Sequence, residues 1–130
     1  MPQNKNKIFI VEDDDFLLEM YVTKFNGAGF EVEVAKSGEE ALEKARQGYQ
    51  ADLVLFDIVM PNVDGFEMLK IMKREKLMPN AVFVVLSNLG EKKDIEKGIQ
   101  IGADDYIIKA YNTPTEVMEK VKNLLENKNK

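Results

Sequence analysis

The sequence of 130 residues predicts an α/β protein in which a doubly wound, five-stranded parallel sheet of order 2-1-3-4-5 lies between two layers of helices. Short apolar runs of strand length alternate five times with stretches of helical periodicity. None of the connections carries a tight hairpin signal, so successive strands are expected to be parallel. One run has the alternating pattern of a strand with an exposed face, which fits the edge of a sheet.

The five expected strands are rich in β-branched and aromatic residues, as strands usually are. They are Ile8–Val11, Phe30–Ala35, Leu53–Phe56, Ala81–Leu86 and Tyr106–Ile108. The second strand alternates polar and apolar residues, which places it at an edge. The first, third and fourth are continuously apolar, as expected for strands covered on both faces, and the order 2-1-3-4-5 suits both patterns.

Between the strands, apolar residues recur at the spacing of amphipathic helices. These positions are Leu17, Met20, Tyr21, Phe25 and Ala28; Ala41, Leu42 and Ala45; Phe66, Leu69 and Met72; Ile95 and Ile99; and Val117, Val121, Leu124 and Leu125. The helix starts carry pairs that resemble capping boxes, namely Ser37 with Glu40, Asp64 with Glu67, and Thr113 with Glu116, the last beside Pro114. Gly48 and Gly102 suit the C-terminal ends of helices.

Composition excludes several classes of function. There are 18 Lys and Arg against 23 Asp and Glu, a net charge of −5, which argues against nonspecific nucleic-acid binding. The absence of cysteine excludes disulfides and thiolate chemistry, and the absence of histidine excludes Ser-His-Asp triads and His-ligated zinc. The longest early apolar run, Ile8–Val11, is too short for a signal peptide or a membrane span, so we expect a cytoplasmic protein.

Polar residues follow the carboxyl ends of four strands, where ligands bind in doubly wound sheets. They are Glu12-Asp13-Asp14-Asp15 after the first strand, Asp57 after the third, Ser87-Asn88 after the fourth and Lys109 after the fifth. We interpret Asp14 and Asp15 as residues that cap a helix or lie in its first turn, whereas Asp57 places a charge at the carboxyl end of a buried strand. Carboxylates gathered at one rim repel one another, and a hard cation such as Mg²⁺ would relieve that repulsion.

The residues from about Lys7 to Asn127 resemble the receiver domain of two-component response regulators. The matching segments are Ile8-Phe9-Ile10-Val11-Glu12-Asp13-Asp14, Asp57-Ile58-Val59-Met60-Pro61 with Asp64-Gly65, Ser87, and Gly102-Ala103-Asp104-Asp105-Tyr106-Ile107-Ile108-Lys109. The resemblance implies a flavodoxin-like three-layer sandwich with the strand order 2-1-3-4-5. It also implies a phosphorelay function, in which a phosphoryl group passes from a kinase phosphohistidine to Asp57 with the help of Mg²⁺.

The resemblance further implies a role for each site residue. The phosphoacceptor is Asp57; the Mg²⁺ ligands are Glu12 through water, Asp13, Asp57 and the backbone carbonyl of Val59; the groups on the phosphoryl oxygens are Ser87 and Lys109. Tyr106 is the switch aromatic, which moves inward as Ser87 is drawn toward the phosphate. Tyr106 also fits a simple packing role in the fifth strand.

Two features depart from the family pattern or refine it. Ala110 follows Lys109, where the family commonly has a proline after a cis peptide bond. Because a non-proline cis bond costs roughly 2.5–4 kcal/mol, either that strain is retained or the bond is trans and the Lys109 ammonium is displaced. Val59 and Leu89 lie two residues beyond Asp57 and Ser87, at positions that tune dephosphorylation in this family. Both are aliphatic here, so we expect slow loss of the phosphoryl group.

The resulting hypothesis is a phosphoacceptor switch that is not an enzyme, although it assists its own phosphorylation and dephosphorylation. A histidine kinase or phosphotransfer protein would be the donor, and the face of the fourth helix, fifth strand and fifth helix would bind a downstream protein. We expect no direct contact with nucleic acid or membrane, and a monomer or a phosphorylation-dependent dimer. The receiver domain is expected over residues 7–127, with polar tails at 1–6 and 128–130. Because no output domain follows Lys130, we expect a stand-alone receiver, and the alternative that the chain is a piece of a larger protein is left open.

Other functions fit the sequence less well. The main alternative is a receiver-like binding module that works without phosphorylation. Haloacid-dehalogenase-like phosphatases need a second Asp where Val59 stands, and a P-loop nucleotidase needs a glycine-rich loop that does not occur here. A flavodoxin-like electron carrier is disfavoured because Glu12-Asp13-Asp14-Asp15 would repel the flavin phosphate.

Overall fold

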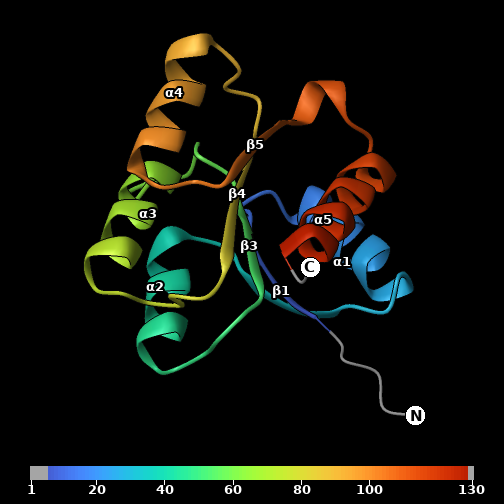
Figure 1. Ribbon diagram of the computed structural model, residues 1–130, viewed down its shortest axis with the longest axis horizontal. Coiled ribbons are helices and arrows are strands. Elements are labelled where there is room, and N and C mark those ends of the chain that lie inside the picture. The colour runs from blue at the N-terminus through green and yellow to red at the C-terminus, as the bar shows by residue number, and fades with distance from the viewer. Residues whose placement is uncertain (1–5, 129–130) are drawn as a thin grey trace.

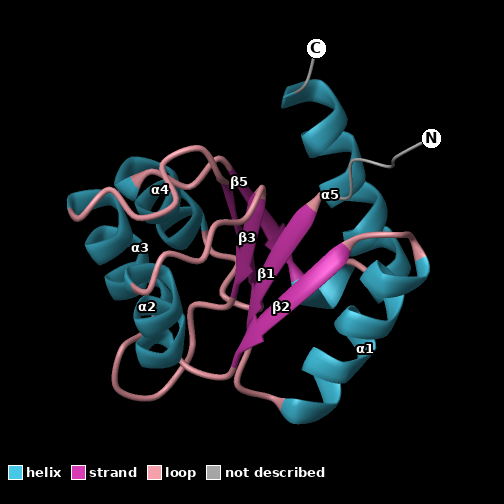
Figure 2. Ribbon diagram, turned by 90° about the horizontal axis from the view of Figure 1, so that it is seen from below, coloured by secondary structure: helices cyan, strands magenta, loops and turns pink. Residues whose placement is uncertain are grey.

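The computed structural model describes residues 6–128 and confirms the expected sheet, whose parallel strands lie in the order β2-β1-β3-β4-β5 (Figures 1 and 2). The strands are β1 (Lys7–Val11), β2 (Glu31–Ala35), β3 (Leu53–Phe56), β4 (Val82–Ser87) and β5 (Asp105–Ile108). The helices are α1 (Asp15–Gly27), α2 (Gly38–Arg46), α3 (Gly65–Arg74), α4 (Lys92–Ile101) and α5 (Pro114–Lys128), and a 3-10 turn, η1 (Lys109–Tyr111), joins β5 to α5. The strand ends differ from the expected ones by no more than one residue.

The sheet is the middle of three layers. Helices α2, α3 and α4 cover one face, and α1 and α5 cover the other (Figure 1). Figure 2 shows β2 at one edge of the sheet, as its alternating pattern predicted. Glu31 of β2 is exposed, whereas every residue of β3 is buried, because only the inner strands have neighbours on both sides and helices on both faces.

Side chains of the strands alternate between two apolar cores, one on each face of the sheet. In β1, Ile8 and Ile10 belong to the core that α1 and α5 complete, while Phe9 and Val11 belong to the core beneath α2 and α3. This alternation explains why the inner strands read as continuous apolar runs. Both faces of each inner strand are buried, so no polar residue interrupts the run.

The expected caps are present at the helix starts. Asp14 accepts a hydrogen bond from the Leu17 amide, Ser37 from Glu40, Asp64 from Glu67 and Thr113 from Glu116. The interpretation of Asp14 as a cap of α1 is therefore confirmed. Gly48 and Gly102 follow α2 and α4 with φ of +103° and +130°, conformations that favour glycine.

Two helices bury different residues from those that the periodicity indicated. In α1 the buried residues are Leu18, Tyr21 and Phe25, whereas Met20 is 36% exposed. Three successive apolar residues near the start of α1 allow two helical faces, and the contact with the sheet selects the one that contains Leu18. In α4 the only buried residue is Gly98, so this helix is held by little apolar burial.

The terminal tails predicted at 1–6 and 128–130 lie mostly outside the described residues. The backbone carbonyl of Asn6 accepts a hydrogen bond from the Glu31 amide at 3.0 Å, and α5 continues to Lys128. Across residues 6–128, no helix combines the length and the apolar character needed to cross a membrane.

Candidate functional site

The polar residues at the carboxyl ends of the strands come together at the point where the strand order reverses. Glu12 and Asp13 follow β1, Asp57 follows β3, and Lys109 reaches this place from the end of β5. They share a hollow of about 490 Å³ lined by Glu12, Asp13, Asp14, Leu17, Asp57, Val59, Ser87, Asn88 and Lys109. The sequence therefore predicted which strand ends meet.

Asp57 is 7% exposed and each of its carboxylate oxygens has a partner. Oδ1 accepts hydrogen bonds from the backbone amides of Ile58 at 2.7 Å and Val59 at 3.3 Å. Oδ2 accepts a hydrogen bond from Lys109 Nζ at 2.8 Å. The backbone amide of Asp57 donates to the Val11 carbonyl at 3.1 Å, which ties the residue to the end of β1. The carboxylate is consequently held in one orientation at the floor of the hollow.

Lys109 pairs with two buried acids at once. Its Nζ lies 2.6 Å from Glu12 Oε1 and 2.8 Å from Asp57 Oδ2, and its side chain is only 10% exposed. Burial lowers the pKa of Lys109, but the hydrogen bonds to Asp57 and Glu12 outweigh it, so the pKa lies above its usual value. Burial raises the pKa of Glu12, and the bond to Lys109 offsets only part of that rise. Lys109 is therefore a fixed ammonium between two carboxyl groups.

The placement of Lys109 corrects one expectation from the sequence. None of the peptide bonds between residues 6 and 128 is cis, so the bond to Ala110 is trans. A trans bond was expected to displace the ammonium, and this inference was wrong. The backbone after β5 turns into η1, and Asn112 Nδ2 donates to the Ile108 carbonyl at 2.9 Å across that turn. This turn keeps the Lys109 side chain directed into the hollow.

Three carboxylates in the hollow could hold a divalent cation. Glu12, Asp13 and Asp57 each offer an oxygen, and these oxygens lie within 4.8 Å of one another. An all-oxygen set with one exposed member, Asp13, suits Mg²⁺, which binds few carboxylates and keeps several waters. The side chain of Val59 is 59% exposed at the rim, so it does not close the hollow.

A glycine holds the segment after Asp57 close to α3. A Cβ at Gly65 would lie 2.2 Å from the Asp57 carbonyl oxygen and 2.8 Å from Ile58 Cα. The Gly65 amide donates to the Ile58 carbonyl at 2.9 Å. Because these neighbours are backbone atoms, any larger residue would push the Asp57 segment away. Gly65 thus positions Asp57.

Ser87 lies on the other side of the hollow and is fully buried. Its Oγ accepts a hydrogen bond from the Leu89 amide at 3.3 Å, so it does not cap α4, which begins with a capping box of Glu91 and Asp94. The Leu89 carbonyl accepts a hydrogen bond from the Tyr106 hydroxyl. The backbone of Leu89, through its amide and its carbonyl, thereby links the residues that the sequence predicted as the two parts of a switch.

Sequence reasoning gave no role to two residues that line the hollow. Asn88 directly follows Ser87, and its position at the end of β4 was a signal that could have identified it. Leu17 had no such signal because its spacing matches a core position of a helix. Only the start of α1 beside Asp14 brings it to the rim.

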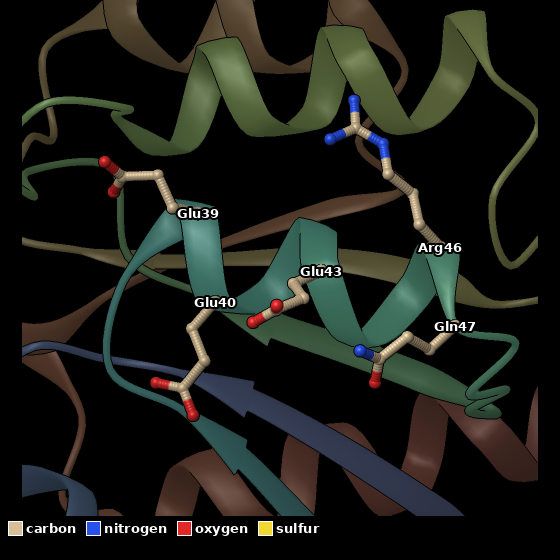
Figure 3. A pocket seen from close by; sticks show the side chains of 5 residues that line it. All are labelled: Glu39, Glu40, Glu43, Arg46 and Gln47. Carbon is tan, nitrogen blue, oxygen red and sulfur yellow. The ribbon is translucent and has the colours of Figure 1, made fainter.

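A second hollow, of about 520 Å³, lies along the surface of α2 (Figure 3). It is lined by Glu39, Glu40, Glu43, Arg46 and Gln47. Arg46 makes two hydrogen bonds, at 2.9 and 2.7 Å, to Glu75, the residue that follows α3, and Glu40 accepts a hydrogen bond from the Lys36 amide. These pairings describe the charged outer face of a helix, and we assign no site to it.

Comparison with known proteins places this architecture in one family. The sequence matches the response regulator receiver domain over residues 8–122. The chain is 34% identical over 121 residues to the alkaline phosphatase synthesis transcriptional regulatory protein PhoP of Bacillus subtilis, covering 92% of this chain and 48% of that protein. It is 36% identical to the transcriptional regulatory protein CpxR homolog of Haemophilus influenzae, covering 92% of this chain and 50% of that one. The chain thus spans about half the length of these relatives.

Solved structures agree with the sequence match. A CheY-like response regulator receiver domain protein from Methanospirillum hungatei superimposes with a TM-score of 0.85 at 31% identity, covering 95% of this chain and 96% of that one. The chemotaxis protein CheY4 of Vibrio cholerae gives a TM-score of 0.83 at 25% identity, covering 92% of this chain and 98% of that one. Both neighbours match over almost their whole length, so the similarity extends over the complete sandwich.

Proposed function

This chain belongs to the response regulator receiver domain family, and from that premise we propose that it is a phosphoacceptor switch in which Asp57 receives a phosphoryl group from a phosphohistidine. The observation that most directly supports this proposal is the pairing of the buried Asp57 carboxylate with the Lys109 ammonium at 2.8 Å. A nucleophile and a positive charge are thereby held side by side, as phosphoryl transfer requires.

The transfer uses one oxygen of Asp57. That oxygen attacks the phosphorus, the bond between phosphorus and the donor imidazole breaks, and the imidazole nitrogen leaves with the bonding electron pair. Oδ1 is held by two backbone amides, which orient the carboxylate. Lys109, already bound to Oδ2, follows the charge onto the phosphoryl oxygens, and the Ser87 hydroxyl contacts another of them. In this way the chain assists its own phosphorylation. Because it does not act on a separate substrate, we do not class it as an enzyme.

Glu12, Asp13 and Asp57, with the Val59 carbonyl, would hold Mg²⁺ beside the acceptor. The ion supplies positive charge for the phosphoryl oxygens and lowers the repulsion among the acids. The acidic oxygens are suitably close, and the exposed Asp13 leaves a side of the set open to water and phosphate.

The output would leave through α4, β5 and α5. Phosphorylation adds charge and strong acceptors beside Ser87, and the backbone amide and carbonyl of Leu89 connect Ser87 to Tyr106 of β5. Ile99 of α4 is 48% exposed and Tyr111 after β5 is 78% exposed, which gives this face apolar contact points. The occupant would be a downstream protein or a second copy of the chain. Relatives of about twice this length are named as transcriptional regulators, so an attached effector is one form that partner can take.

The main alternative is a binding module that works without phosphorylation, and a Lys109 ammonium displaced by Ala110 would favour it. With Ala110 in place, Lys109 still contacts both Glu12 and Asp57. These contacts support the phosphoacceptor over the alternative.

Intact mass spectrometry tests the proposal. After incubation with acetyl phosphate or phosphoramidate and Mg²⁺, the protein should gain one phosphoryl group, and Asp57→Asn or a chelator should abolish the gain. Asp15→Asn is the matched control, because Asp15 lies in the same acidic run but pairs with Lys36 at 2.9 Å. This variant should be phosphorylated like the parent. No gain with either donor, or an equal gain in Asp57→Asn, would contradict the proposal.

A further inference from the structure

Helix α4 contacts the rest of the molecule through an unusual residue. Its one buried position is Gly98, which lies in the interior of the helix. A Cβ at Gly98 would lie 3.3 Å from Tyr106 Cδ2, 3.4 Å from Tyr106 Cε2 and 3.6 Å from Phe66 Cε1. The Tyr106 ring therefore lies directly against the helix backbone, in a notch that exists because residue 98 has no side chain.

The glycine that forms this notch lowers the intrinsic stability of α4. Glycine in a helix interior is less favourable than alanine because the unfolded chain loses more conformational freedom on folding. The backbone conformation at Gly98 does not require glycine, since its φ is not in the left-handed region. The close approach of Tyr106 is the structural feature here that favours a glycine, because a Cβ would oblige the ring to shift by a few tenths of an ångström.

The ring in this notch is connected to the phosphoacceptor hollow. The Tyr106 hydroxyl donates to the Leu89 carbonyl, and the Leu89 amide donates to Ser87 Oγ. The neighbouring Gly90 supports the same arrangement, because a Cβ there would lie 2.8 Å from Ile108 Cδ1 of β5. Moving the ring out of the notch would break the hydrogen bond that holds the Leu89 peptide.

We propose that Gly98 is a positioning residue: its missing side chain seats Tyr106 against α4, and the seated ring holds the backbone of Leu89, and through it the Ser87 hydroxyl, ready for the phosphoryl group. The inference rests on the proposed function, because it assigns the seat a purpose in phosphoryl binding at Asp57. By linkage, any change that unseats the ring must weaken the binding of a phosphoryl group or its mimic at Asp57.

The first experiment measures the seat without any phosphorylation. A thermal double-mutant cycle combines Gly98→Ala with Tyr106→Ala, and Gly27→Ala serves as the matched control. Gly27 is the last residue of α1, and a Cβ there meets nothing within 4 Å. Gly27→Ala should change Tm equally in both backgrounds. Gly98→Ala, in a helix interior, should raise Tm by roughly 2–4 °C only in the Tyr106→Ala background. Equal gains in both backgrounds would overturn the proposal.

The second experiment measures the effect at Asp57. With Mg²⁺ present, the affinity for beryllofluoride, a phosphoryl mimic, should fall about fivefold in Gly98→Ala and stay unchanged in Gly27→Ala. The loss should disappear in the Tyr106→Ala background, which a general loss of stability would not produce. An unchanged affinity in Gly98→Ala would overturn the positioning role. If the parent neither binds beryllofluoride nor accepts a phosphoryl group, the proposed function fails, whereas the thermal cycle reports on the seat independently.

Discussion

The two loops that border the phosphoacceptor hollow are held in place in different ways. In the β3–α3 loop, residues 57–64, Asp57 is tied to Val11 and Lys109, and two further sets of contacts are local: Asp57 binds the two amides that follow it, and Gly65 binds Ile58. In the β4–α4 loop, residues 88–91, Leu89 is bonded to Tyr106 of β5, and Gly90 lies against Ile108 of the same strand. Beyond Asp57 itself, the first loop is held by backbone contacts close in sequence, whereas the second also depends on side chains of β5.

This difference suits the two tasks that we propose. An acceptor must keep its carboxylate in one geometry, and short-range backbone contacts provide that rigidity. A loop that reports phosphorylation must have a second arrangement, and a few long-range side-chain contacts can be exchanged at low free-energy cost. The comparison predicts that small changes in the β3–α3 loop damage the fold, while changes in the β4–α4 loop alter coupling.

The largest effect is expected for Gly65→Ala. Its Cβ would lie 2.2 Å from a backbone oxygen, so the Asp57 segment must shift, and the free energy of unfolding should fall by about 3 kcal/mol. Urea denaturation measures this value, with Gly27→Ala as the control that has no neighbour within 4 Å. A loss below about 1 kcal/mol would show that the β3–α3 loop is as adaptable as the other.

The next effect concerns the lifetime of the phosphorylated protein. Val59 and Leu89, one residue in each loop, can neither orient nor activate water. The double variant Val59→Asn with Leu89→Glu should lose the phosphoryl group about tenfold faster or more, since positioned polar groups assist proton transfer. The decay is followed by intact mass, and Val59→Leu with Leu89→Met is the aliphatic control. If the Asn and Glu variant decays like the parent, these positions do not tune the reaction.

A smaller effect is expected from the crowded acids. Asp57→Asn removes one of three neighbouring carboxylates while Lys109 keeps its bond to Glu12 at 2.6 Å. The metal-free variant should therefore melt about 3 °C higher than the parent. Mg²⁺ should raise the Tm of the parent by mass action and that of the variant much less. A Tm that responds to neither change would remove the argument from carboxylate repulsion.

The smallest effect is a pH dependence at Tyr106. Burial, followed by the charges of Asp94 and Asp57, raises the pKa of Tyr106 from 10.0 to about 12. The folded state therefore keeps its proton longer than the unfolded state, so this contribution is fully present below pH 10 and is lost as pH rises toward 12. Tyr106→Phe should therefore remove this part of the fall in the free energy of unfolding at alkaline pH.

Tyr49→Phe is the control for this experiment. Burial, with smaller effects from Glu33, Glu31 and Asp52, also raises the pKa of Tyr49 to about 12, so Tyr49→Phe should change the alkaline decline in the same direction. The Tyr49 hydroxyl has no hydrogen-bond partner among the described residues. At pH 8, only Tyr106→Phe should lower stability, by about 1 kcal/mol, because only it loses a hydrogen bond. Equal stabilities at pH 8 would show that the bond to Leu89 contributes nothing.

The strand order and the acidic rim were predictable because they follow from short-range patterns. Continuous apolar runs identify strands buried on both faces, and parallel strands necessarily bring their carboxyl ends to one rim, so Asp57 and Glu12 had to be near neighbours. The caps at Asp14, Ser37 and Asp64 were equally local, because each pairs a side chain with an amide three residues away.

Contacts between distant segments could not be read from the pattern. The buried face of α1 was ambiguous until the sheet selected Leu18, and the position of Lys109 depended on how η1 turns rather than on the residue after it. The notch at Gly98 is the clearest case. Periodicity favoured Ile95 and Ile99 as the inward residues of α4, but the ring of Tyr106 needs space there. That space is a property of two elements packed together, and a glycine in one helix does not reveal which side chain will fill it.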